Sequence, residues 1–229
     1  MSTTGDNFAQ ITLRVLAATQ PAPNGTFGAA VTILAVSKTR TADELRALAM
    51  LGQKDFGESY VQEALPKRRE LADLPLEWHL IGHLQSNKAR AAAMAFDWVQ
   101  SVDRIKLVAE LARHRPSDMK PLNVLVQVNI DDEASKSGCR PADVFALAEA
   151  IAGEPRLLLR GLMAIPAPDP DMQRRRDAFR AMKRQFDELR TRYPDVDTLS
   201  MGMSEDFELA IAEGATMVRI GTALFGERS

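Results

Sequence analysis

Short apolar segments rich in β-branched residues alternate with helix-like segments along almost the whole chain. This alternation is typical of βα units, in which helices connect parallel strands. The segment over 31–37 is almost continuously apolar, as expected for a strand that is covered on both faces. Further strands are predicted over 55–57, 77–81, 97–102, 123–130, 157–163, 198–201 and 216–220.

Helix signals occupy the intervals between these strands. Thr41 with Glu44 and Ser59 with Gln62 have the spacing of a capping box, so each pair predicts the start of a helix. Other helices are predicted over 86–94, 103–113, 141–153, 171–192 and 204–213. The helices predicted over 103–113 and 171–192 each have an apolar stripe. The stripe consists of Ile105, Val108 and Leu111 in the first helix, and of Met172, Phe179, Met182, Phe186 and Leu189 in the second.

Eight strands, each followed by a helix, predict a single (β/α)8 barrel, also called a TIM barrel. We expect one domain over 1–229, with an extra helix formed outside the barrel by about the first 20 residues. The alternative is a doubly wound open sheet. That fold favours a glycine-rich turn after its first strand, and the segment 36–40 contains no glycine.

The charge balance excludes some classes of function. The chain has 29 Lys plus Arg against 31 Asp plus Glu, which argues against binding to a nucleic-acid backbone.

No basic leader and no apolar run of about 18 residues is present, so neither a secretory signal nor a membrane span is expected. Cys139 is the only cysteine, and this fits a reducing compartment. We therefore expect a soluble cytoplasmic protein.

Lys38 is the first candidate site residue because it directly follows the first predicted strand. The carboxyl ends of barrel strands converge on one mouth, where active sites are found. A lysine with its stem in apolar surroundings has a lowered pKa and can form a Schiff base with a carbonyl compound. The alternative is a lysine that points past the rim into solvent.

The last strand and the loop after it provide a second group of candidates. Arg219 lies in or at the end of the last strand, and Gly221 and Thr222 follow it with backbone N–H groups and a hydroxyl that suit an anion. The preceding loop adds small donors at Ser200, Gly202 and Ser204. Barrels often bind phosphate after strands seven and eight. Ordinary turn and capping chemistry is the alternative.

The remaining polar residues give weaker signals. His79 and His83 are four apart, but on a strand and its exit loop that spacing does not bring two metal ligands together, and no nearby residue completes a ligand set. We therefore expect no metal site. His114 is expected at the surface, and surface charge is the favoured interpretation of Asp131, Asp132 and Glu133, near Lys136.

A lysine on strand one and an anion site after strands seven and eight suit a carbonyl compound that carries a phosphate. Pyridoxal 5′-phosphate is such a compound, although the residues alone also fit an aldolase-like enzyme.

Six ordered blocks of the sequence extend these local signals over 33–228. They are ILAVSKTR at 33–40, FGESYVQEA at 56–64, WHLIGHLQSNKAR at 78–90, VLVQVNIDDEASKSG at 124–138, RGLMAIPAP at 160–168 and LSMGMSEDFELAIAEGATMVRIGTALFGER at 199–228. Through these blocks the chain resembles the pyridoxal phosphate homeostasis protein family. The resemblance implies a barrel similar to the N-terminal domain of alanine racemase.

The resemblance also implies roles for individual residues. Lys38 matches the lysine that bears the cofactor as an aldimine, and Arg219 matches the arginine beside the pyridine nitrogen. Ser200, Gly221 and Thr222 match positions around the phosphate. One departure is visible at Ser59, where the family usually has asparagine after Phe-Gly-Glu, so any contact of that asparagine near the cofactor is in doubt here.

Two functions follow as alternatives. The first is a non-catalytic, monomeric protein that carries or buffers pyridoxal phosphate in vitamin B6 homeostasis and transiently contacts apo-enzymes that use this cofactor. The second is a pyridoxal phosphate-dependent racemase or a related amino-acid enzyme. The resemblance implies that the chain lacks the second racemase domain, which supplies a tyrosine base, and only Tyr60 and Tyr193 occur here. A carrier is therefore the favoured hypothesis.

Overall fold

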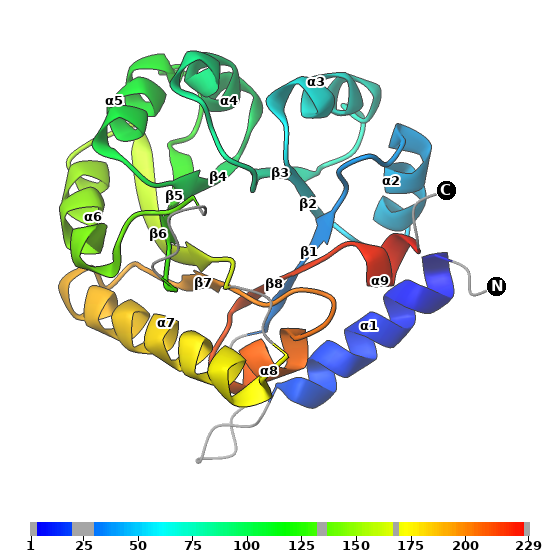
Figure 1. Ribbon diagram of the computed structural model, residues 1–229. Helices are drawn as coiled ribbons and strands as arrows, with labels where there is room; N and C mark the ends of the chain where they lie inside the picture. The colour runs from blue at the N-terminus through cyan, green and yellow to red at the C-terminus, as the bar shows by residue number, and fades with distance from the viewer. Residues whose placement is uncertain (1–3, 20–29, 132–136, 167–169, 227–229) are drawn as a thin grey trace.

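The computed structural model describes residues 4–19, 30–131, 137–166 and 170–226. Eight parallel strands close into a barrel in the order β1 to β8, with helices around its outside (Figure 1). The predicted (β/α)8 barrel is thus confirmed. The strands are β1 (Thr32–Val36), β2 (Asp55–Glu58), β3 (Glu77–Leu80), β4 (Trp98–Val102), β5 (Leu122–Val128), β6 (Leu157–Ala164), β7 (Thr198–Ser200) and β8 (Met217–Ile220).

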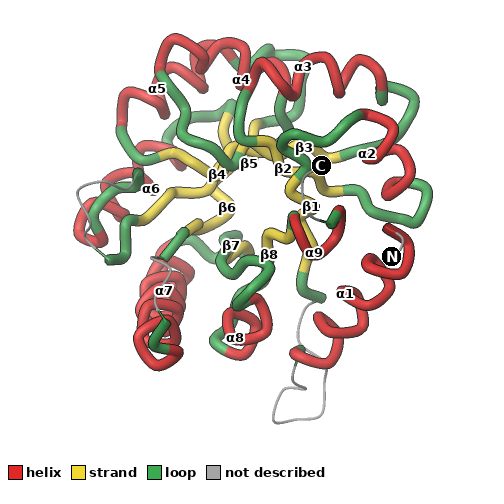
Figure 2. Tube along the Cα trace, turned by 45° about the vertical axis from the view of Figure 1, so that its right-hand side comes forward, coloured by secondary structure: helices red, strands yellow, loops and turns green. Residues whose placement is uncertain are grey.

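The helices form a ring around the strands (Figure 2). They are α1 (Thr4–Ala18), α2 (Ala42–Ala49), α3 (Val61–Glu70), α4 (Ala89–Ala95), α5 (Ile105–His114), α6 (Val144–Ala152), α7 (Met172–Arg192), α8 (Phe207–Ala212) and α9 (Thr222–Phe225), with short 3-10 turns η1 (Ser86–Lys88) and η2 (Pro141–Asp143). The expected extra helix is α1, which packs on α2, α8 and α9. The Asn7 side chain also donates a hydrogen bond to the carbonyl of Leu224 in α9.

The two predicted capping boxes have different outcomes. Thr41 and Glu44 form a complete box at the start of α2. The prediction for Ser59 and Gln62 is wrong, because the chain stays extended through Tyr60, which precedes α3 without a side-chain cap. Ser59 instead packs against the loop after β3, where a Cβ on Gly82 would lie 2.1 Å from the Ser59 carbonyl oxygen. Only glycine at position 82 allows this close approach.

The apolar stripes of α5 and α7 are confirmed except at their first residues. Phe179, Met182, Phe186 and Leu189 of α7 are buried, as are Val108 and Leu111 of α5. Ile105 and Met172 are instead 53% and 54% exposed. Each begins its helix, and helical side chains tilt toward the helix N-terminus, so these two point away from the packed turns.

The barrel interior differs from the core between strands and helices. The outer core is one continuous apolar cluster that extends from Ile11 in α1 to Leu224 in α9. Inside the barrel, a separate small cluster of Trp98, Leu125 and Met163 lies among buried polar side chains. Among them Gln100 of β4 contacts Ser200 of β7, and these two strands are not neighbours in the sheet, so this contact crosses the interior.

Candidate functional site

Two adjoining cavities open at the carboxyl end of the barrel. Their volumes are about 320 and 330 Å³, at the lower end of the range for small-molecule sites. Val36, Lys38, Met203 and Arg219 line both of them. The barrel therefore brings the first and last candidate residues of the sequence together at one mouth.

Lys38 lies two residues beyond the end of β1 and is half-buried. Its side chain faces both cavities instead of pointing past the rim. Ser59, Ile81 and Gln127 line the first cavity with it, from the loops after β2 and β3 and from the end of β5. A primary amine at this position has access to a ligand held in either cavity.

A buried ion pair holds the backbone on the N-terminal side of Lys38. Lys67 of α3 places its Nζ 2.8 Å from a carboxylate oxygen of Glu58 and donates to the Ser37 carbonyl at 2.9 Å. The Ser37 hydroxyl donates to the same Glu58 oxygen at 2.6 Å. Burial raises the pKa of Glu58, and its hydrogen bonds to Lys67 and Ser37 oppose that rise. No local sequence pattern indicates these contacts, because their residues are separated in the sequence.

The backbone on the other side of Lys38 is held as well. Thr39 has φ 64°, a left-handed conformation that is unfavourable for a β-branched residue. Its N–H donates to a carboxylate oxygen of Glu63, and this oxygen also accepts from Lys67 at 2.8 Å. Lys67 and Glu63 thus connect the α3 helix to both residues that flank Lys38.

Arg219 projects from β8 into the barrel mouth and is 3% exposed. Its Nη1 donates to the carbonyl and to the hydroxyl of Ser200, both at 2.9 Å, and its Nη2 donates to the Ala164 carbonyl at 2.8 Å. Burial lowers the pKa of Arg219 to about 10, and Asp206 partly opposes this. The guanidinium is therefore charged at neutral pH and only donates hydrogen bonds.

The other anion-site candidates occupy two different places. Gly221 and Thr222 line the second cavity, together with Ser204. At Gly221 a Cβ would lie 3.3 Å from atoms of Val36, so the missing side chain leaves room at this edge of the cavity. Ser200 is fully buried beneath Arg219, and its hydroxyl donates to Gln100 Oε1 at 2.8 Å.

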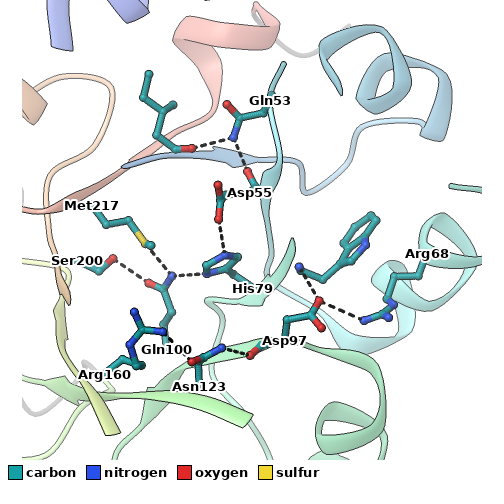
Figure 3. A network of polar contacts seen from close by, with 12 residues as sticks. Gln53, Asp55, Arg68, His79, Asp97, Gln100, Asn123, Arg160, Ser200 and Met217 are labelled. Atoms are coloured by element: carbon teal, nitrogen blue, oxygen red, sulfur yellow. Dashed lines mark hydrogen bonds and ion pairs between the residues drawn. The ribbon is translucent and has the colours of Figure 1, made fainter. Parts of the chain in front are cut away.

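The two spaced histidines are separated by the fold. His79 is fully buried in the barrel interior, where it contacts Asp55 and Gln100 (Figure 3). His83 lies at the mouth, with Nδ1 3.2 Å from the Ser137 hydroxyl. His114 ends α5 at the surface. Of the acidic loop, Asp132 and Glu133 lie outside the described residues, as does Lys136.

Comparison with known proteins first defines the class of barrel. The profile of the family described as "Alanine racemase, N-terminal domain" matches residues 24–229. The solved alanine racemase of Corynebacterium glutamicum has a TM-score of 0.66 at 19% identity, with 97% of this chain and 61% of that chain covered. This second likeness shows the fold alone.

Closer relatives then define the family. A pyridoxal phosphate homeostasis protein of Pseudomonas aeruginosa is 53% identical over 100% of this chain and 97% of its own length. One from Escherichia coli K12 is also 53% identical, with 86% of each chain covered. The structure of PipY from Synechococcus elongatus with PLP bound has a TM-score of 0.81 at 37% identity, with 98% of this chain and 100% of that chain covered. The chain belongs to the pyridoxal phosphate homeostasis protein family.

Among the described segments, no helix has the length and apolar character needed to cross a membrane.

Proposed function

We propose that this protein binds pyridoxal 5′-phosphate reversibly through Lys38 and carries or buffers it in vitamin B6 homeostasis. The observation that carries the proposal is the meeting of Lys38 and Arg219 in two joined cavities, with Gly221 and Thr222 on the rim of one. The names of its relatives and the PLP-bound PipY structure support the same ligand.

Each residue has a distinct part in this proposal. Pyridoxal phosphate supplies an aldehyde, which condenses with a primary amine and releases water. Lys38 provides that amine from a backbone held by Glu58, Glu63 and Lys67. Gly221 and Thr222 would hold the phosphate through N–H groups and a hydroxyl. Arg219 would donate to the ring nitrogen. Ser200 is expected near the phosphate from the resemblance, but it is fully buried and its hydroxyl donates to Gln100, so we assign it the role of orienting Arg219 instead.

A non-catalytic role is supported by two features of the site. An arginine that donates to the ring nitrogen would leave that nitrogen without a proton, and the ring would then be a weaker electron sink. A racemase also needs a proton donor on the face opposite Lys38. Tyr60 is 65% exposed, and Tyr193 is the C-cap residue of α7 on the outer ring; neither lines a cavity that contains Lys38.

The wider cellular role is also part of this proposal. Residues 1–229 form a single cofactor-binding barrel domain, supported by the continuous outer core from α1 to α9. The protein acts as a cytoplasmic monomer and transiently contacts apo-enzymes that receive the cofactor. The single cysteine is consistent with a reducing compartment.

Visible absorbance tests the ligand and its attachment point. Wild-type protein loaded with pyridoxal phosphate is expected to show a visible band that is lost in Lys38→Ala and kept in Lys88→Ala. Lys88 is a matched control because it lines a neighbouring cavity that Lys38 does not line. Borohydride reduction followed by peptide mass spectrometry should place the adduct on Lys38. Absence of the band in wild type, or an adduct elsewhere, contradicts the proposal.

A second measurement separates a carrier from an enzyme. The loaded protein is incubated with L-amino acids in deuterated water, and exchange at Cα is followed by NMR. We expect no sustained exchange. Continued exchange with turnover, lost in Lys38→Ala, would establish the racemase-type alternative.

A further inference from the structure

A chain of polar side chains, buried except at Asp55, crosses the barrel from its amino-terminal face to Arg219. Asp55 Oδ1 lies 3.2 Å from His79 Nε2, and His79 Nδ1 lies 3.0 Å from Gln100 Nε2. Gln100 Oε1 lies 2.8 Å from the Ser200 hydroxyl, which lies 2.9 Å from Arg219 Nη1. Figure 3 shows the part of this chain from Asp55 to Ser200. We call these five residues the interior relay.

Chemistry determines the direction of every hydrogen bond in the interior relay. A guanidinium only donates and a carboxylate only accepts, so the two ends are fixed. Arg219 donates to Ser200, Ser200 donates to Gln100, Gln100 donates to His79, and His79 donates to Asp55. His79 is therefore the neutral tautomer with its proton on Nε2, because Nδ1 accepts from Gln100.

The middle of the relay is held in this orientation by further contacts. The Gln100 amide nitrogen also lies 3.2 Å from Met217 Sδ, a weak acceptor. The His79 ring stacks on Trp98 with ring centroids 5.0 Å apart and planes at 12°. Reversing the Gln100 amide would place its N–H groups against the Ser200 hydroxyl. That hydroxyl would then lose its acceptor, and it cannot donate to the guanidinium.

The Asp55 end of the interior relay is partly exposed to solvent. Asp55 is the first residue of β2, and its side chain is 28% exposed. With Trp98, Arg160 and Met217 it lines a cavity of about 240 Å³ at the amino-terminal face, opposite the mouth that contains Lys38. Barrel interiors are ordinarily filled by branched apolar side chains. A directed chain of hydrogen bonds between the two faces therefore indicates a specific function.

We propose that Asp55, His79 and Gln100 are positioning residues that fix Arg219 for its contact with the ring nitrogen of pyridoxal phosphate. This inference rests on the proposed function. Two of the guanidinium bonds go to backbone carbonyls, and the third goes to the Ser200 hydroxyl, whose orientation the relay determines. Residues at the far face of the barrel thus influence how firmly the cofactor is held.

The test compares variants along the relay with one beside it. Gln100→Leu and Asp55→Leu break the relay, whereas Asp55→Asn keeps an acceptor oxygen for His79. Asn123→Leu is the matched control: Asn123 lies at the start of β5 and bonds to Asp97 and Arg160, outside the relay (Figure 3). The readouts are the dissociation constant for pyridoxal phosphate and the pH midpoint of the visible band.

We expect Gln100→Leu and Asp55→Leu to weaken pyridoxal phosphate binding about 5- to 10-fold, the effect of losing one ordinary hydrogen bond, and to shift the pH midpoint. Asp55→Asn should restore most of the affinity. Asn123→Leu should lower thermal stability without changing either readout. Relay variants that behave as Asn123→Leu does would overturn the inference, and Asp55→Leu decides the matter if Gln100→Leu does not fold.

A measurement on cofactor-free wild type separates this inference from the proposed function. The ¹⁵N chemical shifts of His79 should show a protonated Nε2 and an unprotonated Nδ1. A proton on Nδ1 would overturn the relay even if the visible band is present. Conversely, the expected tautomer without any band would leave the hydrogen-bond chain intact and contradict the proposed function.

Discussion

At the scale of single residues, burial determines the chemistry of the charged and nucleophilic groups. Arg219 keeps its charge at neutral pH because its lowered pKa of about 10 is still well above 7. The buried Cys139 thiol, in contrast, stays uncharged at neutral pH. Burial, with Asp143 and Asp103 nearby, raises the pKa of its thiol to about 12, so its reactive thiolate is scarce.

The Cys139 thiol should therefore resist alkylation in the folded protein. At pH 8 a pKa of about 12 leaves a thiolate fraction on the order of one in ten thousand. We expect iodoacetamide to modify Cys139 slowly in the native state and fully in 6 M guanidinium, as followed by intact mass. Rapid modification of the native protein would show that the thiol is more accessible than its burial indicates.

At the scale of secondary-structure elements, α3 holds the loop that contains Lys38. Lys67 and Glu58 form an ion pair with side chains that are 9% and 0% exposed. Removing one partner of a buried pair leaves an uncompensated charge and is more damaging than removing both. The ion pair therefore couples the stability of the barrel to the position of Lys38.

Lys67→Met should lower the free energy of unfolding by about 3–5 kcal/mol at pH 8. The double variant Glu58→Gln with Lys67→Met should lose less, since no buried charge remains. Burial raises the pKa of Glu58 above its ordinary value, so the folded protein keeps the carboxyl proton to a higher pH than the unfolded chain does. The contribution of Glu58 to stability is therefore present at low pH and is lost as the pH rises through the folded pKa. The difference between the variants should thus be smaller near pH 5.

Urea unfolding curves at pH 5 and pH 8 measure this difference. A larger loss of stability in the double variant than in Lys67→Met would contradict the buried-charge explanation.

At the scale of the whole molecule, the outer core links α1 to the candidate cofactor site. The α1 helix packs on α8 and α9, and α9 follows directly from Gly221. Because the candidate site is lined by residues from the first and last strands, a ligand bound there would join distant parts of the chain. Ligand binding to the native state alone raises the apparent stability of the whole barrel.

Pyridoxal phosphate at 100 times its dissociation constant should stabilise the fold by about 2.7 kcal/mol. For a chain of this size that corresponds to a rise in Tm of roughly 5–10 °C. Lys38→Ala should show a much smaller rise, because the covalent attachment is lost. Differential scanning calorimetry with and without ligand checks this, and equal shifts in both proteins would contradict the role of Lys38.

Some of these properties could be read from the sequence. The alternation of apolar runs with helix signals predicted the barrel, because strands buried on both faces need apolar side chains throughout. Lys38 and Arg219 stood out because they follow or end such runs, where barrel strands reach the mouth. The Thr41 capping box was confirmed because it depends only on local spacing, and the Ser59 box was wrong because packing against Gly82 overrides the local pattern.

Only the tertiary structure decided how these residues are supported. Gln100 and Ser200 are separated by 100 positions, and they meet because barrel closure turns β4 and β7 toward the same interior. Lys67 reaches Ser37 across 30 positions for a similar reason. Hydrophobic periodicity records which face of an element is buried, but not which polar side chain lies opposite once the barrel closes.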